Sequence, residues 1–190
     1  HMIKNIKPLF TVIIGTRPEA IKLAPLIIAF KKCKKIKTRV ILTGQHREMA
    51  KQVMNLFDVK EDKNLNLMLA NQSINHITIE ALNKLKVEFS LNQPELVIVQ
   101  GDTTTAFSAA LAAFYEKIPL AHVEAGLRTN DLLNPFPEEA NRRLISQIAQ
   151  LHFAPSKIAK RNLISSGIKT NIKVTGNTVI DSLKYIDKKL

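Results

Sequence analysis

The stretch Leu96-Val97-Ile98-Val99-Gln100-Gly101-Asp102-Thr103-Thr104-Thr105 decides the fold, because a short apolar run ends abruptly in a polar turn. A second such run ends in His122-Val123-Glu124-Ala125-Gly126, and Pro137-Glu138-Glu139 opens a helical pattern. Each carboxylate therefore stands where a strand stops or a helix starts. In an open α/β sheet these places face one crevice beyond the carboxyl ends of the strands. Three acids at one crevice indicate proton-transfer chemistry.

Outward from this stretch, short β-branched runs alternate with longer amphipathic segments. The expected strands cover residues 10–14, 38–42, 96–99, 120–123, 152–154 and 172–175. The expected helices cover residues 20–32, 48–57, 73–91, 105–115, 138–150 and 157–165, and another begins after Gly176. This repetition predicts an α/β fold with a parallel sheet and right-handed crossovers. The unpatterned loop 125–137 lies between two candidate acids, which favours a functional role.

Composition limits the class of protein. The chain has 190 residues, of which 45% are hydrophobic, enough for one large domain with an ordinary core. Its single cysteine, Cys33, cannot form an internal disulfide and is expected to be inert, and a reducing cytoplasm fits this usage. No apolar run is long enough for a membrane span. We expect residues 1–2 to be a cloning remnant, 3–176 to form one domain, and 177–190 to form a helix leading toward a domain that the chain lacks.

The net charge is +12, from 28 basic against 16 acidic residues, so an anionic partner has to be considered. Much of the excess is local, because Lys31, Lys32, Lys34, Lys35 and Lys37 gather where the first helix ends. Cations at that end favour the helix dipole, so a solvated helix end explains them without a partner. The alternative, a basic nucleic-acid-binding module, would bind unrelated oligonucleotides in a salt-dependent way.

The first strand-to-helix turn combines helix capping with a candidate anion site. Thr16 and Glu19 fit a capping box, and Pro18 suits the first turn of a helix. Capping does not require Arg17, which stands at an amide-rich helix start that attracts phosphate, with Lys22 about one turn deeper.

Each acid also has a structural alternative. Asp102 or a neighbouring threonine is suited to cap the next helix. His122 and Glu124 are two residues apart on a strand and are expected to point to the same side, so a metal pair is conceivable. The third ligand that a metal site needs is missing nearby. Glu138 and Arg142 are four residues apart and could form a surface salt bridge of about 0.3 to 0.5 kcal/mol.

Taken together, these segments resemble the non-hydrolysing UDP-N-acetylglucosamine 2-epimerases. The matching stretches, in family order, are Gly15-Thr16-Arg17-Pro18-Glu19-Ala20-Ile21-Lys22, Thr43-Gly44-Gln45-His46-Arg47-Glu48-Met49, Gly101-Asp102-Thr103-Thr104-Thr105, His122-Val123-Glu124-Ala125-Gly126-Leu127-Arg128-Thr129, Pro135-Phe136-Pro137-Glu138-Glu139-Ala140-Asn141-Arg142 and Thr175-Gly176-Asn177-Thr178-Val179-Ile180-Asp181. The resemblance implies a Rossmann-like parallel sheet flanked by helices, the N-terminal half of a GT-B-type two-domain enzyme. The second half, which in the family supplies part of the nucleotide pocket and a histidine, would be missing, so the chain alone is expected to be inactive.

The implied reaction interconverts UDP-N-acetylglucosamine and UDP-N-acetylmannosamine. UDP is eliminated to give 2-acetamidoglucal and is then added back, with the proton delivered to the opposite face. By similarity, the acid/base candidates are Asp102, Glu124 and Glu138, and we expect at least one of these clustered acids to have a raised pKa. The resemblance also implies that Arg17 and Lys22 recognise the substrate and its phosphates. We add Arg142 to these substrate-binding residues, as the side chain that orients Glu138. The resemblance implies no metal, no nicotinamide, and a homodimer at full length.

A possible allosteric site for UDP-N-acetylglucosamine would include Gln45, His46 and Gln72. This chain has Asn71 where some members carry an arginine, so retention of the activation stays open. Half of a GT-B glycosyltransferase is the competing enzyme, because it would use the same crevice, but fold alone does not fix function.

Overall fold

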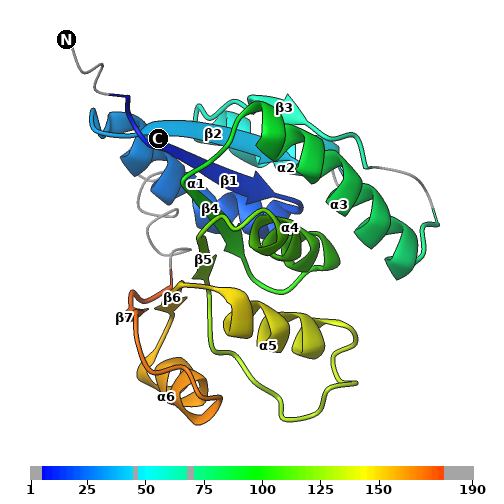
Figure 1. Ribbon diagram of the computed structural model, residues 1–190, viewed down its shortest axis with the longest axis vertical. Helices are drawn as coiled ribbons and strands as arrows, with labels where there is room; N and C mark the ends of the chain where they lie inside the picture. Colours follow the sequence, from blue (N-terminus) through cyan, green and yellow to red (C-terminus); the bar gives the residue numbers. More distant parts are fainter. Residues whose placement is uncertain (1–5, 45–46, 68–70, 178–190) are drawn as a thin grey trace.

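The computed structural model describes residues 6–44, 47–67 and 71–177. They form three layers, with one parallel sheet between two layers of helices (Figure 1). In this part of the chain the sheet has seven strands in the order β3-β2-β1-β4-β5-β6-β7, and all pairs are parallel. The strands are β1 (Leu9–Ile14), β2 (Lys37–Leu42), β3 (Lys63–Asn64), β4 (Leu96–Gln100), β5 (Leu120–Val123), β6 (Leu151–Ala154) and β7 (Ile172–Val174). The chain moves outward from β1 to β3 and then returns to place β4 beside β1. That reversal creates the switch point at which ligands bind in such sheets.

Helices cover both faces of the sheet, as the buried strands require. On one face, α1 (Arg17–Lys32) and α2 (Arg47–Leu56) pack on apolar residues of β1, β2, β4 and β5. On the other face lie α3 (Ile74–Leu91), α4 (Thr104–Tyr115) and α5 (Glu138–Ile148). A smaller cluster joins α6 (Lys157–Ser165) to β6 and to the start of the 125–137 loop.

The expected strands and helices are present with bounds shifted by a few residues. The sequence patterns missed β3, whose two residues Lys63–Asn64 carry no apolar signal. The first helix begins earlier than expected, at Arg17, directly after its cap Thr16. The helix expected after Gly176 lies outside the described residues.

Two details of the fold determine what surrounds the switch point. Gly15 is required where β1 meets α1, because a Cβ atom there would lie 2.5 Å from the hydroxyl oxygen of Thr105 at the start of α4. The lysine cluster around the C-terminus of α1 is exposed. Since α1 begins at the carboxyl edge of the sheet and runs back, these lysines lie at the opposite edge from the three carboxylates.

Candidate active site

The three predicted acids gather at the carboxyl edge of the sheet. Asp102 follows β4, Glu124 follows β5, and Glu138 is the first residue of α5. Burial raises the pKa of Asp102, the Arg142 guanidinium opposes this rise, and the charges of Glu124 and Glu138 add to it. The expected raised pKa is therefore confirmed for Asp102, although burial contributes more than the repulsion between carboxylates.

Asp102 does not cap the helix that follows it. The cap of α4 is Thr103, whose hydroxyl accepts a hydrogen bond of 3.1 Å from the amide of Ala106. The carboxylate of Asp102 instead faces Arg142, with 3.4 Å between Oδ2 and Nη1. The capping alternative is thus wrong for Asp102, whose side chain is available for chemistry.

Glu124 lies at the point where β5 turns out of the sheet, with a φ of 65°. Its Oε2 atom forms an ion pair with Lys22 of α1 and accepts a hydrogen bond of 2.9 Å from Gln100 Nε2. Gln100 is buried at the end of β4 and was missed as a site residue, because its only signal was a polar residue closing an apolar strand. Lys22 and Gln100 together fix the carboxylate of Glu124 beside the switch point.

The expected pair of Glu138 with Arg142 does not form among the described residues. Arg142 donates instead from Nε to Oε1 of Glu139 at 2.7 Å, and its Nη1 reaches Asp102. The side chain of Glu138 is half-buried at the helix start, where a negative charge is favourable. Arg142 thus bridges Glu139 and Asp102 in place of the salt bridge considered with Glu138. Its part in substrate binding stays a prediction.

Glu139 is, after Gln100, the second site residue that the sequence patterns missed. Its side chain is fully buried, yet its carboxylate accepts hydrogen bonds from the amides of Thr129 and Asn130, both at 2.9 Å, and from Arg142 and Arg143. Burial alone would raise the pKa of Glu139, but these donors lower it to about 2. Glu139 is therefore a permanent anion and is unsuited to exchange protons near neutral pH.

The first turn of α1 holds two charged residues with very different surroundings, Arg17 and Glu19. Arg17 is exposed as the first helical residue and forms no ion pair within the described part of the chain. Two residues later, Glu19 is buried, and burial raises its pKa to about 7. Its Oε2 atom has no hydrogen-bond partner among the described residues. The predicted helix cap is confirmed, because the Thr16 hydroxyl accepts a hydrogen bond of 3.5 Å from the Glu19 amide.

The metal pair considered for His122 and Glu124 does not form. His122 is buried and bonds through Nε2 to the carbonyl of Gly101 at 2.7 Å, whereas Glu124 bonds to Lys22 and Gln100. Burial lowers the pKa of His122 to about 4. Across residues 6–44, 47–67 and 71–177, no group of three or more His, Cys, Asp or Glu side chains could hold a metal ion.

The possible allosteric site stays a prediction. Gln72 is half-buried just before α3, and Asn71 has a φ of 59°. Gln45 and His46 lie outside the described residues.

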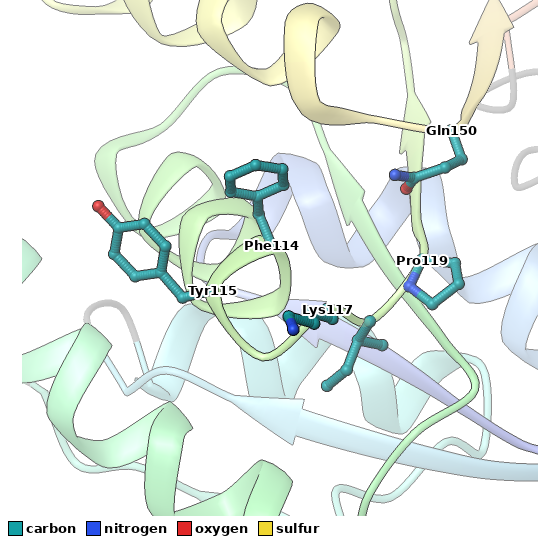
Figure 2. Close-up of a pocket in the computed structure, with 6 residues that line it drawn as sticks. Phe114, Tyr115, Lys117, Pro119 and Gln150 are labelled. Atoms are coloured by element: carbon teal, nitrogen blue, oxygen red, sulfur yellow. The ribbon is translucent and has the colours of Figure 1, made fainter.

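A hollow of about 500 Å³ lies away from the carboxylates, where α4 ends and β5 begins (Figure 2). Its lining residues are Phe114, Tyr115, Lys117, Ile118, Pro119 and Gln150. It is mainly apolar and contains no carboxyl group, and it lies at the opposite edge of the sheet. The three predicted acids lie instead at the carboxyl edge.

Comparison with known proteins shows the family of the chain. The chain matches the family model for UDP-N-acetylglucosamine 2-epimerase over residues 28–190. It is 51% identical over 179 residues to the UDP-N-acetylglucosamine 2-epimerase of Neisseria meningitidis, covering 94% of this chain and 48% of that protein. A putative enzyme of the same name from Thermotoga maritima is 51% identical over 176 residues, covering 93% and 47%. In the described part of the chain, no helix has the length and apolar character that a membrane span requires.

Solved structures lead to the same family. A crystal structure of the N. meningitidis UDP-GlcNAc 2-epimerase bound to UDP-GlcNAc gives a TM-score of 0.91 at 51% identity, covering 96% of this chain and 50% of that one. A lipopolysaccharide outer core galactosyltransferase gives a TM-score of 0.65 at 15% identity, covering 89% and 45%, which reflects the fold alone. The chain thus spans about half the length of the relatives it matches, and the expected Rossmann-like half of a GT-B enzyme is confirmed. The chain belongs to the UDP-N-acetylglucosamine 2-epimerase family.

Proposed function

We propose that the full-length protein interconverts UDP-N-acetylglucosamine and UDP-N-acetylmannosamine by eliminating UDP and adding it back. The observation that carries this proposal is that Asp102, Glu124 and Glu138 lie together at the carboxyl edge of the sheet, with Lys22 paired to Glu124 and Arg142 paired to Asp102. A glycosyltransferase half would not need three carboxylates at this edge.

The chemistry explains why several acids are needed. The hydrogen at C2 of the sugar is not adjacent to a carbonyl, so it is removed as the C1–O bond to UDP breaks, leaving 2-acetamidoglucal. Re-addition of UDP then places a proton at C2 on the opposite face of the ring. Acid/base groups are therefore required on both faces, and general acid or base catalysis contributes about a hundredfold to ten-thousandfold in rate.

The cations have a separate task. As UDP leaves, negative charge grows on the diphosphate, and cations placed in advance stabilise it. Arg17 is exposed at the start of α1, and Lys22 lies one turn further along the helix against Glu124. In the proposal, Arg17 binds the diphosphate, and Lys22 links this charge to the carboxylate that handles the proton.

The proposal extends beyond this chain, which spans about half of its relatives. A second domain would close over the carboxyl edge of the sheet and complete the nucleotide pocket, so the chain alone would not turn over. We also propose a cytoplasmic homodimer at full length, with UDP-N-acetylglucosamine and UDP as its small-molecule partners.

Proton NMR of purified full-length protein incubated with UDP-N-acetylglucosamine tests the function. We expect signals of UDP-N-acetylmannosamine to appear without any acceptor and to reach equilibrium. A matched sample of the Asp102→Asn variant should stay at substrate over the same time. Turnover that requires an acceptor and releases stoichiometric UDP would contradict the proposal and favour a transferase.

A further inference from the structure

Glu139 joins two parts of the site that are separate in the sequence. Its Oε2 atom accepts hydrogen bonds of 2.9 Å from the amides of Thr129 and Asn130, and one of 3.2 Å from Nε of Arg143. Its Oε1 atom accepts Nε of Arg142 at 2.7 Å. One carboxylate thus connects the 125–137 loop to the first turns of α5.

Burial makes this carboxylate a fixed point. A fully buried ion costs several kcal/mol unless hydrogen bonds and opposite charges replace its water. Glu139 is 0% exposed and receives four such bonds, two of them from arginines. Because any displacement would break several bonds at once, the side chains that bond to Glu139 are held in place.

Arg142 connects the fixed carboxylate of Glu139 to Asp102, the acid at the end of β4. The guanidinium of Arg142 is nearly buried, with Nε on Glu139 and Nη1 3.4 Å from Oδ2 of Asp102. The neighbouring Asn141 donates from Nδ2 to the backbone carbonyl of Asp102 at 2.9 Å. Helix α5 therefore contacts Asp102 twice, and Glu139 sets the orientation of the charged contact.

We infer that Glu139 is a positioning residue of the epimerase, which holds Arg142 against Asp102 and fixes the loop that leads to Glu138. This inference rests on the proposed function. It assigns Glu139 no contact with the substrate. Its effect is on the geometry of the two acids, and a displacement of about 1 Å at a reacting group can cost about a hundredfold in rate.

The substitution Glu139→Gln distinguishes the contacts of Oε2 from the contact of Oε1. An amide has one acceptor oxygen, and three donors face the Oε2 side whereas one faces Oε1. The amide oxygen should therefore keep the hydrogen bonds from the loop amides. The NH2 group should then face Nε of Arg142, and these two donors repel each other. Arg143→Met is the matched control, because it removes the other arginine from Glu139 without touching the bond to Arg142.

In the full-length enzyme, we expect Glu139→Gln to lower kcat by about tenfold to a hundredfold with little change in KM for UDP-N-acetylglucosamine. Arg142→Lys, which cannot bridge two carboxylates, should do the same. The double variant should be no slower than the worse single variant, because both changes break one connection. Arg143→Met should stay within about threefold of wild type, since its contacts stop at Glu139 and the loop. Losses that multiply in the double variant, or full activity in Glu139→Gln or Arg142→Lys, would overturn the inference.

A measurement without turnover separates this inference from the proposed function. In 15N-labelled protein, the Nε–H of Arg142 should exchange slowly with water in wild type and in Arg143→Met, and rapidly in Glu139→Gln. Rapid exchange already in wild type would overturn the inference, whatever the activity. If wild type shows slow exchange but does not epimerise, the proposed function fails, and with it the role of Glu139 in catalysis. If Glu139→Gln does not fold, Arg142→Lys alone decides, because it leaves Glu139 with its loop contacts.

Discussion

At the scale of single residues, neighbours decide what each carboxyl group can do. Thr103 caps α4, so the side chain of Asp102 is left to pair with Arg142. Glu139 has four donors and stays ionised, whereas Glu19 is buried without a partner for Oε2 and has a pKa of about 7. None of these differences is visible in the sequence, because each depends on which donors the fold brings near the carboxyl group.

Separate substitutions of Asp102 and Thr103 distinguish a role in the reaction from a role in capping α4. In the full-length enzyme, Asp102→Asn should lower activity by at least about a hundredfold, because an amide cannot carry the transferred proton. Its melting temperature should stay within a few degrees of wild type. Thr103→Ala should instead lose about 1 kcal/mol of stability through the lost cap, or roughly 2 to 4 °C, while most activity remains. Calorimetry and initial rates check both, and an Asp102→Asn variant that keeps nearly full activity would contradict a proton-transfer role for Asp102.

Glu19 should make stability depend on pH. Below pH 4.5 both the folded and unfolded states hold its proton; between about 4.5 and 7 only the unfolded state releases it, so the free energy of unfolding falls as pH rises. The loss is at most about 3 kcal/mol and is complete above pH 7. Glu19→Gln does not titrate, so its stability relative to wild type should increase across this window. Urea unfolding at pH 4.5 and 8 measures the effect, and the exposed Glu95→Gln variant serves as control. A pH-independent difference would contradict the buried neutral carboxyl group.

Arg17 should act on phosphate. Arg17→Ala in the full-length enzyme is expected to weaken binding of UDP and of the nucleotide sugar by similar factors, because a cation at a helix start addresses the diphosphate that both share. Lys31→Ala, at the other end of the same helix, should bind UDP like wild type. Calorimetric titration with UDP decides, and unchanged affinity with reduced activity would assign Arg17 to the sugar.

At the scale of elements, apolar periodicity was sufficient for nearly every strand and helix. The exceptions have physical causes. β3 has two residues and joins the sheet through backbone bonds, which leave no side-chain pattern. The expectation that His122 and Glu124 share a face assumed regular alternation, and the positive φ of Glu124 ends that alternation.

Gly15 should be needed for steric reasons. A Cβ atom there would lie 2.5 Å from Oγ1 of Thr105 and 3.0 Å from Oε2 of Glu19, so Gly15→Ala should destabilise the protein by about 1 to 3 kcal/mol. Adding Thr105→Ala removes the nearest atom and should recover part of the loss. A double-mutant cycle on unfolding free energies measures this coupling, expected at about 0.5 to 3 kcal/mol. Strict additivity would show that Thr105 is not the obstacle.

At the scale of the whole molecule, the convergence of Asp102, Glu124 and Glu138 could be predicted because a parallel sheet brings its carboxyl ends to one edge. The partners of these acids could not be predicted. Arg142 lies three residues from Glu139 and four from Glu138, and both spacings permit a pair on a helix. Arg142 pairs with Glu139 because the 125–137 loop fixes that carboxylate with two amides and Asp102 attracts the other side of the guanidinium.

In the proposed reaction, the full-length protein breaks and remakes the bond between hydrogen and C2 of the sugar. Full-length enzyme in heavy water with UDP-N-acetylglucosamine tests it most directly, by proton NMR of the product at early times. The account predicts deuterium at C2 of UDP-N-acetylmannosamine, because the proton returned to the opposite face comes from a carboxyl group that has exchanged with solvent. Product that keeps its original hydrogen at C2, or a sugar transferred with C2 unchanged, would contradict it.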